Sequence, residues 1–237
     1  MDPVVMVGIV GSGNIGAGVA RMATAADLPV VVANSRGPET LDALISELGP
    51  SATAATVEDA VARADLVVLA LPFGASAALP AASLSGKVVI DATNYYPDRD
   101  GHVPALDAAE LTSSELLARQ WPDAQVVKGL NNVDFLHLPM LPRPAGADDR
   151  TALPIAGDDG DAKARVVTFL DAIGFDALDL GALAEGWRSQ PGSPVYVTPY
   201  YRESDEPDLD PRQRFMTAEP TPVPLETARA LASEATR

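Results

Sequence analysis

Short apolar runs alternate with helix-like segments along most of this chain. Runs rich in Val, Ile and Leu occupy residues 4–10, 30–33, 66–71, 87–91, 125–128, 152–156 and 175–180. Continuous apolar runs of this length are typical of strands that are buried on both faces. Because helical segments separate them, the pattern predicts an α/β fold of the Rossmann type, with a doubly wound, mostly parallel sheet and helices on both faces.

Several helices can be placed from their periodicity and their end signals. Pro38 begins a helix that Gly49 and Pro50 end. Thr56 and Asp59 resemble a capping box for the short helix before residue 65. A later helix spans about residues 161–173. The apolar positions of the first helix recur at helical spacing, at Leu41, Leu44, Ile45 and Leu48. In the last helix the residues expected to face inward are Val166, Val167, Phe169 and Leu170.

The pattern changes beyond Gly181, where prolines become frequent and only residues 225–237 look helical. We therefore divide the chain into a Rossmann domain at residues 1–182 and a small proline-rich extension at residues 183–237. We expect the extension to cover the site or to mediate dimer contacts. The proline- and glycine-rich stretch at residues 139–150 is interpreted as a surface loop, either a lid or a simple connection.

A glycine-rich turn follows the first apolar run directly. It reads Gly11-Ser12-Gly13-Asn14-Ile15-Gly16 and precedes a segment of helical periodicity. In a dinucleotide site the first glycine makes the tight turn, the second lets the backbone approach the pyrophosphate, and the third permits close packing of helix on strand. Glycine turns also occur for ordinary backbone reasons, but this context predicts dinucleotide binding.

The end of the second apolar run indicates which dinucleotide is preferred. The run ends in Asn34-Ser35-Arg36-Gly37, without the Asp or Glu that would accept hydrogen bonds from an NAD ribose. Arg36 offers a planar set of donors for a 2'-phosphate, and Ser35 adds a hydroxyl beside it. Arg36 as a solvated turn residue is the alternative. The pattern favours NADP(H) over NAD(H).

Later strand ends supply candidates for the rest of the site, because ligands of open α/β sheets bind at the carboxyl ends of the strands. Leu71 ends the third long run and Pro72 and Phe73 follow it, and Thr93 and Asn94 follow the next run. Asn131 and Asn132 follow the run after that and are candidates for the substrate side. The alternative for these two amides is that they satisfy the backbone of a turn.

Composition and charge narrow the classes of function. The chain has 237 residues, no cysteine, two histidines and a formal net charge of −16. Thiol chemistry and a Cys-ligated or His-rich metal centre are therefore excluded, and nucleic acid or an anionic membrane is not an expected partner. No leader segment precedes the first strand and no run approaches membrane-spanning length, so we expect a cytoplasmic protein.

With these motifs in view, the chain resembles the coenzyme F420-dependent NADP oxidoreductase family. The matching segments are VGIVGSGNIG, VVVANSRG, LVVLALPFGA, GKVVIDATN, VVKGLNN and ALPIAGDDGDAKARVVTFLDAIGFDALDLG, which together span roughly residues 4–181. The resemblance implies hydride transfer between NADP(H) and a deazaflavin stacked on the nicotinamide. It implies that residues 12–15 line the pyrophosphate and that Ser35, Arg36 and Thr40 lie near the 2'-phosphate.

The chain departs from the family pattern at two places. Phe73 stands where archaeal-type members usually have Trp, and DATNYYPDRDG resembles a broader bacterial branch. The resemblance therefore supports cofactor binding more strongly than it supports the identity of the substrate. F420 carries a phosphate and a polyglutamate tail, for which local cations would be needed. The available cations are Arg99, Lys128, Arg143, Arg150 and Arg188.

The mechanism depends on the hydride acceptor. Transfer between two stacked rings needs orientation and exclusion of water more than a side-chain acid. A carbonyl or imine acceptor would need a proton donor, for which the candidates are His137, Tyr95, Tyr96 and Lys128. His137 has an apolar context that also fits a structural role. Trp187, Tyr196, Tyr200 and Tyr201 are expected either to stack on a flat ring or to pack the tail on the core.

Three functions follow from these observations. The first is an NADP(H)-dependent oxidoreductase with coenzyme F420 as its second redox partner. The second is an NADPH-dependent reductase of a small carbonyl or imine. The third is a non-catalytic NADP(H)-sensing module whose tail docks a partner. We expect a small-molecule partner in the first two cases, with a homodimer as the candidate assembly.

Overall fold

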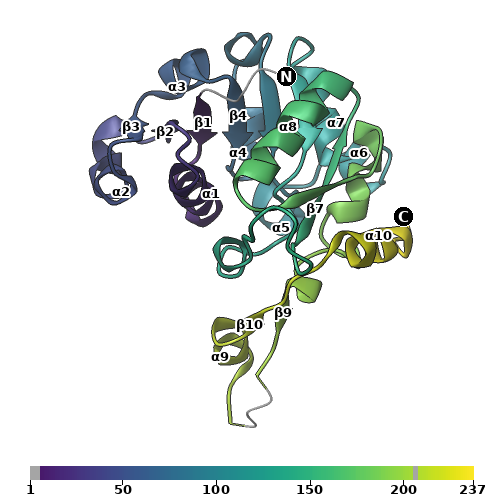
Figure 1. Cartoon of the computed structure of the whole chain (residues 1–237). Helices are drawn as coiled ribbons and strands as arrows, with labels where there is room; N and C mark the ends of the chain where they lie inside the picture. Colours follow the sequence, from purple (N-terminus) through teal and green to yellow (C-terminus); the bar gives the residue numbers. More distant parts are fainter. Residues whose placement is uncertain (1–5, 205–207) are drawn as a thin grey trace.

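The computed structural model describes residues 6–204 and 208–237, and it contains an eight-stranded sheet (Figure 1). Val4 and Val5 of the first predicted strand, and Pro207, lie outside the described residues. The strand order is β3-β2-β1-β4-β5-β6-β7-β8, and every neighbouring pair is parallel except β6 and β7. The predicted Rossmann-type fold class is therefore confirmed.

The strands are short, and most agree with the apolar runs. Their bounds are β1 Val7–Val10, β2 Val30–Ala33, β3 Ala52–Ala54, β4 Leu66–Leu69, β5 Val88–Asp91, β6 Gln125–Lys128, β7 Ala152–Gly157 and β8 Asp176–Asp179. The sequence pattern missed β3, which has only three residues at the edge of the sheet.

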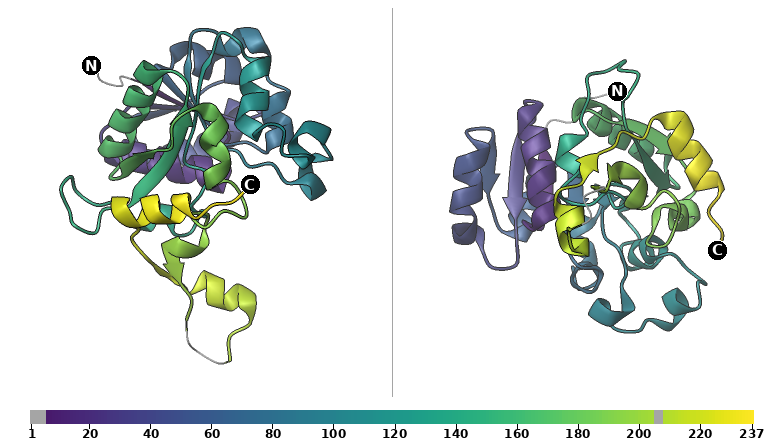
Figure 2. Two further views of the ribbon diagram at one scale, coloured as in Figure 1. Left: turned by 90° about the vertical axis from the view of Figure 1, so that its right-hand side faces the viewer. Right: turned by 90° about the horizontal axis from the view of Figure 1, so that it is seen from below.

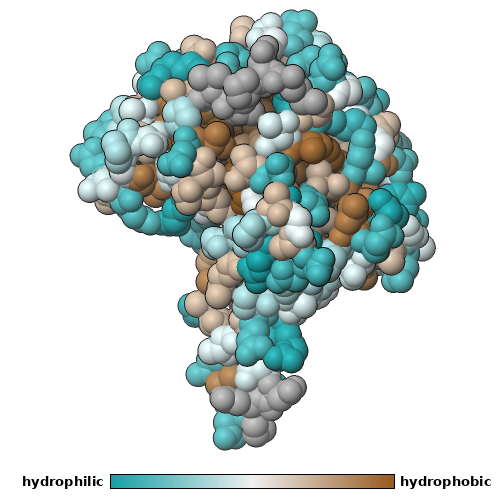
Figure 3. All heavy atoms as spheres, in the orientation of Figure 1, coloured by the Kyte–Doolittle hydropathy of each residue, from teal (hydrophilic) through white to brown (hydrophobic). Residues whose placement is uncertain are grey.

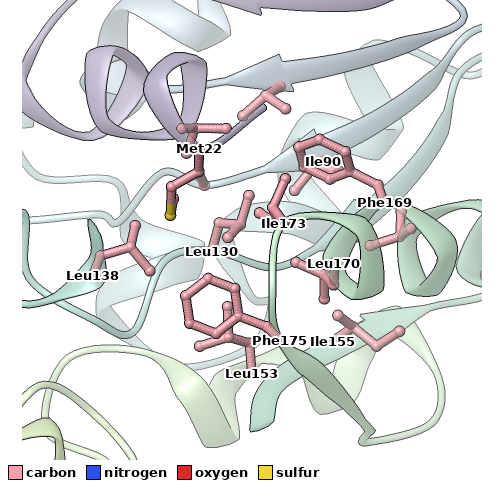
Figure 4. Packing of buried hydrophobic residues seen from close by; sticks show 14 of the residues in the cluster. Met22, Ile90, Leu130, Leu138, Leu153, Ile155, Phe169, Leu170, Ile173 and Phe175 are labelled. Carbon is pink, nitrogen blue, oxygen red and sulfur yellow. The ribbon is translucent and has the colours of Figure 1, made fainter. Parts of the chain in front are cut away.

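The helices cover both faces of the sheet because successive strand side chains point to opposite faces. Val7 and Ile9 of β1 join the core cluster that contains α1 and α8, whereas Val10 joins the cluster that contains α7. Figure 4 shows the first cluster, in which Met22 of α1 and Phe169 of α8 both pack over the sheet. Helix bounds in the Rossmann part are α1 Asn14–Ala25, η1 Pro38–Leu41, α2 Asp42–Leu48, α3 Val57–Arg63, α4 Phe73–Ala77, η2 Ala81–Leu84, α5 Pro97–Asp100, α6 Pro104–Asp107, α7 Ser113–Gln120, η3 Leu138–Met140 and α8 Gly160–Ala172.

Local signals explain where several of these helices begin and end. The side chain of Thr56 accepts a hydrogen bond from the Asp59 N–H, so the Thr56 half of the predicted capping box of α3 is present. Gly49, with φ of +81°, ends α2 as predicted. The expectation that Val167 faces inward is wrong, because its side chain is 42 % exposed on α8. Its neighbours Val166 and Phe169 occupy the buried stripe of that helix.

The extension contains more structure than the sequence pattern predicts. The prediction that only residues 225–237 are helical is wrong, because η4 Leu183–Ser189, η5 Thr198–Tyr200 and α9 Pro211–Met216 precede α10 Leu225–Ser233. Strands β9 Tyr201–Arg202 and β10 Glu219–Pro220 form a second, antiparallel sheet. Proline at the start of α9 marks a helix beginning there rather than irregular chain.

Residues 201–204 and 208–220, which we call the arm, extend away from the sheet (Figures 1 and 2). Figure 3 shows the arm as a narrow projection below a body whose visible face has both hydrophilic and hydrophobic areas. At the base of the arm the ring of Tyr201 stacks on His137 at 5.0 Å, and the Phe215 ring meets both edge-on. None of the helices among the described residues is long and apolar enough to cross a bilayer.

Candidate dinucleotide site

Three glycines shape the turn between β1 and α1, each for a different reason. Gly11 has φ of +112°, and a Cβ there would lie 2.3 Å from the carbonyl oxygen of Ala70. A Cβ on Gly16 would lie 1.8 Å from the carbonyl oxygen of Gly11. A Cβ on Gly13 would meet nothing within 4 Å. Gly11 and Gly16 therefore permit the tight turn and the close packing, whereas Gly13 leaves open space beside the backbone.

The N-terminus of α1 is open to an anion. The helix begins at Asn14 without a side-chain cap at Gly13 and without an acidic residue in its first turn. Ser12 and Ile15 are half-buried, and Gly13 and Asn14 are exposed. The first N–H groups of a helix, together with its dipole, favour a phosphate at this position.

Asn34 ties the glycine turn to the loop after β2. Its Nδ2 donates to Ser12 Oγ at 3.1 Å and to Thr40 Oγ1 at 2.9 Å, and its Oδ1 accepts from the Arg36 N–H at 2.9 Å. The sequence pattern gave no role to this residue. Ser35 and Arg36 are exposed on the loop, but the Thr40 hydroxyl already bonds Asn34 and the Gly37 carbonyl.

A carboxylate lies close to this loop although none ends the strand. The Glu39 side chain folds over Gly37, where an added Cβ would lie 2.5 Å from Glu39 Oε1. Charge near a 2'-phosphate is therefore mixed, with Arg36 favouring the phosphate and Glu39 opposing it.

A cleft of about 360 Å³ continues from the glycine turn along the ends of β4, β5 and β6. It brings together eight of the predicted site residues, which are Gly13, Asn14, Ile15, Leu71, Pro72, Thr93, Asn94 and Asn131. Thr93 Oγ1 is buried there and has no hydrogen-bond partner in the part of the chain that the structure describes. A buried hydroxyl without a partner is free to bond to a ligand.

Phe73 and Asn132 are among the predicted residues that do not line the cleft. Phe73 begins α4 with its side chain 3 % exposed and packs edge-on against Tyr95 at 5.5 Å. Asn132 is fully buried, and its Nδ2 donates to the Val195 carbonyl at 3.0 Å and to Tyr200 Oη at 2.6 Å. Asn132 thus holds the extension against the strand ends, while Asn131 pairs with Asn94 through a 3.1 Å hydrogen bond.

Lys128 is a buried support for the cleft. Its Nζ donates to the Thr93 carbonyl and lies 3.3 Å from Asp91 Oδ2, which also accepts from Ser114 Oγ at 2.6 Å. Burial lowers the pKa of Lys128, and the Asp91 carboxylate opposes that shift. The Lys128 side chain is 0 % exposed. The predictions that it donates a proton in the cleft or serves as a cation for an F420 tail are therefore wrong.

Two of the remaining proton-donor candidates lie outside the cleft. His137 is 2 % exposed, with Nδ1 at 2.8 Å from Asp134 Oδ2 and Nε2 at 3.2 Å from the Ala218 carbonyl. Tyr95 Oη donates to Asp107 at 2.7 Å. Both have partners that give them structural roles, so Tyr96 is the one residue of this group that lines the cleft.

The far wall of the cleft combines Tyr96 and Arg99 with Tyr196 from the extension. The two phenol oxygens are 2.5 Å apart, and Asn94 Nδ2 donates to Tyr196 Oη at 3.5 Å. The Arg99 guanidinium lies 4.9 Å from the Tyr96 ring centre and donates to the Asn94 carbonyl at 2.7 Å. Sequence reasoning treated Tyr196 only as an aromatic residue of the tail and did not pair it with Tyr96.

Most of the other predicted aromatic and cationic residues are elsewhere. Tyr200 is buried on Asn132, Tyr201 stacks on His137, and Trp187 lies beside Arg188. The remaining arginines have acidic partners outside the cleft, which are Asp149 for Arg143, Asp171 and Asp176 for Arg150, and Glu185 for Arg188. Of the five cations named from the sequence, Arg99 is the one that lines the cleft.

A strained turn places Tyr196. Val197 has φ of +58° and ψ of −62°, and the Thr198 N–H donates to the Tyr196 carbonyl at 2.7 Å. This is a γ-turn of the positive-φ kind, which is rare and costs a β-branched residue about 1–3 kcal/mol. Asn132 stabilises the turn from both sides, because its carbonyl accepts from the Val197 N–H at 2.8 Å and its side chain bonds the Val195 carbonyl.

The fold and the glycine turn define an NAD(P)-binding Rossmann protein of the oxidoreductase class. Residues 6–95 match the family described as NADP oxidoreductase, coenzyme F420-dependent. The chain belongs to this family.

The chain is also similar to solved structures and to curated proteins. A hypothetical protein, SMa0349 from Sinorhizobium meliloti, is 31 % identical with a TM-score of 0.71, covering 81 % of this chain and 93 % of its own. A proposed F420-dependent NADP-reductase from Arthrobacter sp. FB24 is 29 % identical with a TM-score of 0.59, covering 76 % and 85 %. Metalloreductase STEAP3 of Rattus norvegicus is 29 % identical over 199 residues, 83 % of this chain and 38 % of that protein. The chain spans less than two fifths of the length of the curated relatives that it matches.

Proposed function

We propose that the protein transfers a hydride between NADP(H) and a second redox partner bound in the cleft. The observation that carries this proposal is the continuity of the site. The anion-binding turn at Gly13 and Asn14 forms one end of the same cleft that Thr93, Asn94 and Tyr196 form at the other. A dinucleotide with its pyrophosphate on α1 would place its nicotinamide beside the Thr93 hydroxyl.

The preference for NADP(H) rests on the loop after β2. Arg36 and Ser35 are exposed there, and Asn34 fixes the loop against the glycine turn. A guanidinium binds a phosphate through two parallel hydrogen bonds, which an unphosphorylated ribose does not offer. Calorimetry with NADPH and NADH tests this preference, and equal affinities would contradict it.

We propose coenzyme F420 as the second redox partner. The family description supports it, and so does the aromatic wall of the cleft, where Tyr96, Phe135 and Tyr196 offer faces for a flat ring. Arg99 is the cation that lines the cleft, and its guanidinium is already paired with Asp100 at 2.8 Å, so an acidic group of that partner would have to share it. The test is to mix the purified protein with NADPH and F420 and to follow the deazaflavin absorbance. No change at high protein concentration would reject F420.

The paired phenols favour a second candidate, the reduction of a small carbonyl or imine. Such a substrate needs a proton as well as a hydride, and Tyr96 and Tyr196 place two hydroxyls at the cleft. Cyclohexanone and 2-methyl-1-pyrroline serve as probes. NADPH oxidation with either probe, together with no reaction with F420, would favour this candidate over the first.

For assembly we propose a homodimer formed through the arm. The arm leaves the body of the molecule (Figure 1). The Met216 side chain on it is 53 % exposed. Sedimentation of the full chain and of Met216→Asp measures the oligomeric state and so tests this proposal. A monomer at all concentrations would contradict it.

A further inference from the structure

Two hydroxyl groups meet at the cleft from segments far apart in the chain. Tyr96 follows β5 and Tyr196 belongs to the extension, yet their oxygens are 2.5 Å apart. Asn94 Nδ2 lies 3.5 Å from Tyr196 Oη, so an amide, a phenol and a second phenol form one hydrogen-bonded row along the cleft wall. A phenol can donate and accept at once, which a row of this kind requires to pass a proton.

The structure holds Tyr196 more firmly than packing alone would require. Asn132 bonds the backbone on both sides of it, and Val197, which also lines the cleft, keeps the strained γ-turn. Asn132 is itself fully buried, with its Nδ2 also donating to Tyr200 Oη at 2.6 Å. Strain that surrounding contacts maintain is typical of functional segments. This strain is next to the phenol that lines the cleft.

We propose that Tyr196 is the proton donor of the reaction, and that Tyr96 connects it to solvent. The proposal rests on the proposed function, because it needs a hydride transfer in the cleft. It assigns to the extension a catalytic residue, so the Rossmann part alone would not form the complete site.

The proposed step balances in atoms and electrons. A hydride, with its electron pair, moves from the reduced nicotinamide to the carbon of a C=O or C=N group, and the π electrons of that bond move to its oxygen or nitrogen. With a deazaflavin the hydride goes to the carbon that replaces the flavin N5, and the π electrons move through the conjugated double bonds to a ring nitrogen. That atom takes the Tyr196 proton, Tyr196 takes one from Tyr96, and Tyr96 takes one from water. NADPH is oxidised, the acceptor is reduced, and one proton is consumed.

The electrostatics of the pair keep the Tyr196 hydroxyl protonated, while the raised pKa makes it a weaker acid than a free phenol. Burial and the hydrogen bond to Tyr96 raise the pKa of Tyr196 far above that of a free phenol, and Arg99 opposes the shift. The hydroxyl therefore keeps its proton throughout the neutral range. With Tyr96 donating to Tyr196 Oη, the Tyr196 hydrogen is free to point to the acceptor atom.

Tyr196→Phe and Tyr96→Phe test the proposal, with Tyr95→Phe as the matched control because its hydroxyl faces Asp107 outside the cleft. We expect Tyr196→Phe to lower kcat by about 100-fold, within the usual range for loss of a general acid, and Tyr96→Phe by about tenfold. Tyr95→Phe should stay within about threefold of wild type, and the Kd for NADPH should be unchanged in all three variants.

A binding readout that does not depend on turnover completes the experiment. F420 is titrated into NADP⁺-saturated protein and followed by its fluorescence, and Tyr196→Phe should bind it about fivefold more weakly than Tyr95→Phe. If wild type turns over F420 or a carbonyl probe and Tyr196→Phe keeps its rate, Tyr196 is not the donor while the proposed function stands. If wild type neither binds F420 nor oxidises NADPH with any of the probes, both the function and the donor role are overturned.

Discussion

The two ends of the cleft are built in different ways. The anion end, from Gly11 to Thr40, comes from one continuous strand-turn-helix-strand unit and depends mainly on backbone shape. The acceptor end gathers residues from the ends of β4, β5 and β6 and from Tyr196 and Val197 of the extension. It depends on side-chain hydrogen bonds between segments that are distant in sequence. The difference indicates that changes at the first end should affect cofactor binding, and changes at the second should affect turnover.

The largest effect on stability is expected at Gly16, in the anion end of the cleft, which depends on backbone shape. Gly16→Ala would place a Cβ 1.8 Å from the Gly11 carbonyl oxygen, in a place where only backbone could move. We expect a loss of about 3 kcal/mol or more in the free energy of unfolding, together with loss of NADPH binding.

Gly18→Ala on the same helix is the matched control for Gly16→Ala. A Cβ at Gly18 meets nothing within 4 Å, so the substitution should stabilise the helix by about 0.5–1 kcal/mol. Urea denaturation and calorimetry measure both variants. Equal stability of the two would show that the tight packing of α1 on the turn is unimportant.

The next effect concerns the buried support of the acceptor end. Lys128→Met leaves the Asp91 carboxylate buried without its cation, which should cost about 3–5 kcal/mol of unfolding free energy. Adding Asp91→Asn to this variant should recover part of the loss, because it removes the unpaired charge. Urea denaturation of the three proteins checks this, and a double variant less stable than the single one would contradict it.

The same pair predicts a dependence on pH. Because burial lowers the pKa of Lys128 in the folded state, the unfolded chain holds that proton more tightly. Stability therefore rises with pH as it approaches 10.5, the ordinary lysine value, and Lys128→Met lacks this rise. The difference in unfolding free energy between wild type and Lys128→Met should widen with pH across that window. A constant difference would show that Lys128 is not perturbed.

A smaller effect is expected at Arg36, in the anion end of the cleft. Its substitution should change cofactor binding without changing stability. Arg36→Ala removes a charged hydrogen-bond donor to the 2'-phosphate, worth about 1.5–3 kcal/mol, or roughly 10- to 100-fold in the Kd for NADPH. The Kd for NADH and the unfolding free energy should not change, because the Arg36 side chain is exposed. Calorimetry with both cofactors decides, and equal weakening of NADPH and NADH would indicate a general role in the loop.

The same difference between the two ends of the cleft explains which parts of the fold and of the site could be predicted from the sequence. The glycine turn, the strands from β4 to β6 and the cap at Thr56 are local patterns, and the structure confirms their geometry. The pairing of Tyr96 with Tyr196 was beyond reach, because nothing in one sequence shows which tail aromatic reaches which strand end. Lys128 failed as a donor for a similar reason, since its burial depends on Asp91 and on the extension packing over it. Asn131 and Asn132 are adjacent and chemically identical, so the sequence does not distinguish their roles. In the fold Asn132 holds the extension through the Val195 carbonyl, whereas Asn131 lines the cleft.

The smallest effect on stability is expected at Val197. Relief of the strain there should leave stability nearly unchanged while it slows turnover. Glycine adopts φ of +58° without steric cost, so Val197→Gly relieves the γ-turn while it loses the valine contacts and gains freedom in the unfolded chain. These terms are each about 1 kcal/mol and nearly cancel. Val197→Ala keeps the unfavourable backbone and loses similar contacts, so it should be less stable than Val197→Gly by about 1 kcal/mol.

At most ordinary positions Ala is the more stable of these two residues, so the reversed order is a sensitive test of the turn. Urea denaturation of both variants measures it, and Ala above Gly would mean that the γ-turn is not strained. Turnover should follow the opposite order, because a freer turn at residue 197 no longer fixes the Tyr196 hydroxyl against the acceptor. A Gly variant that is as stable as wild type but slower would show that the extension contributes geometry to the acceptor end rather than stability.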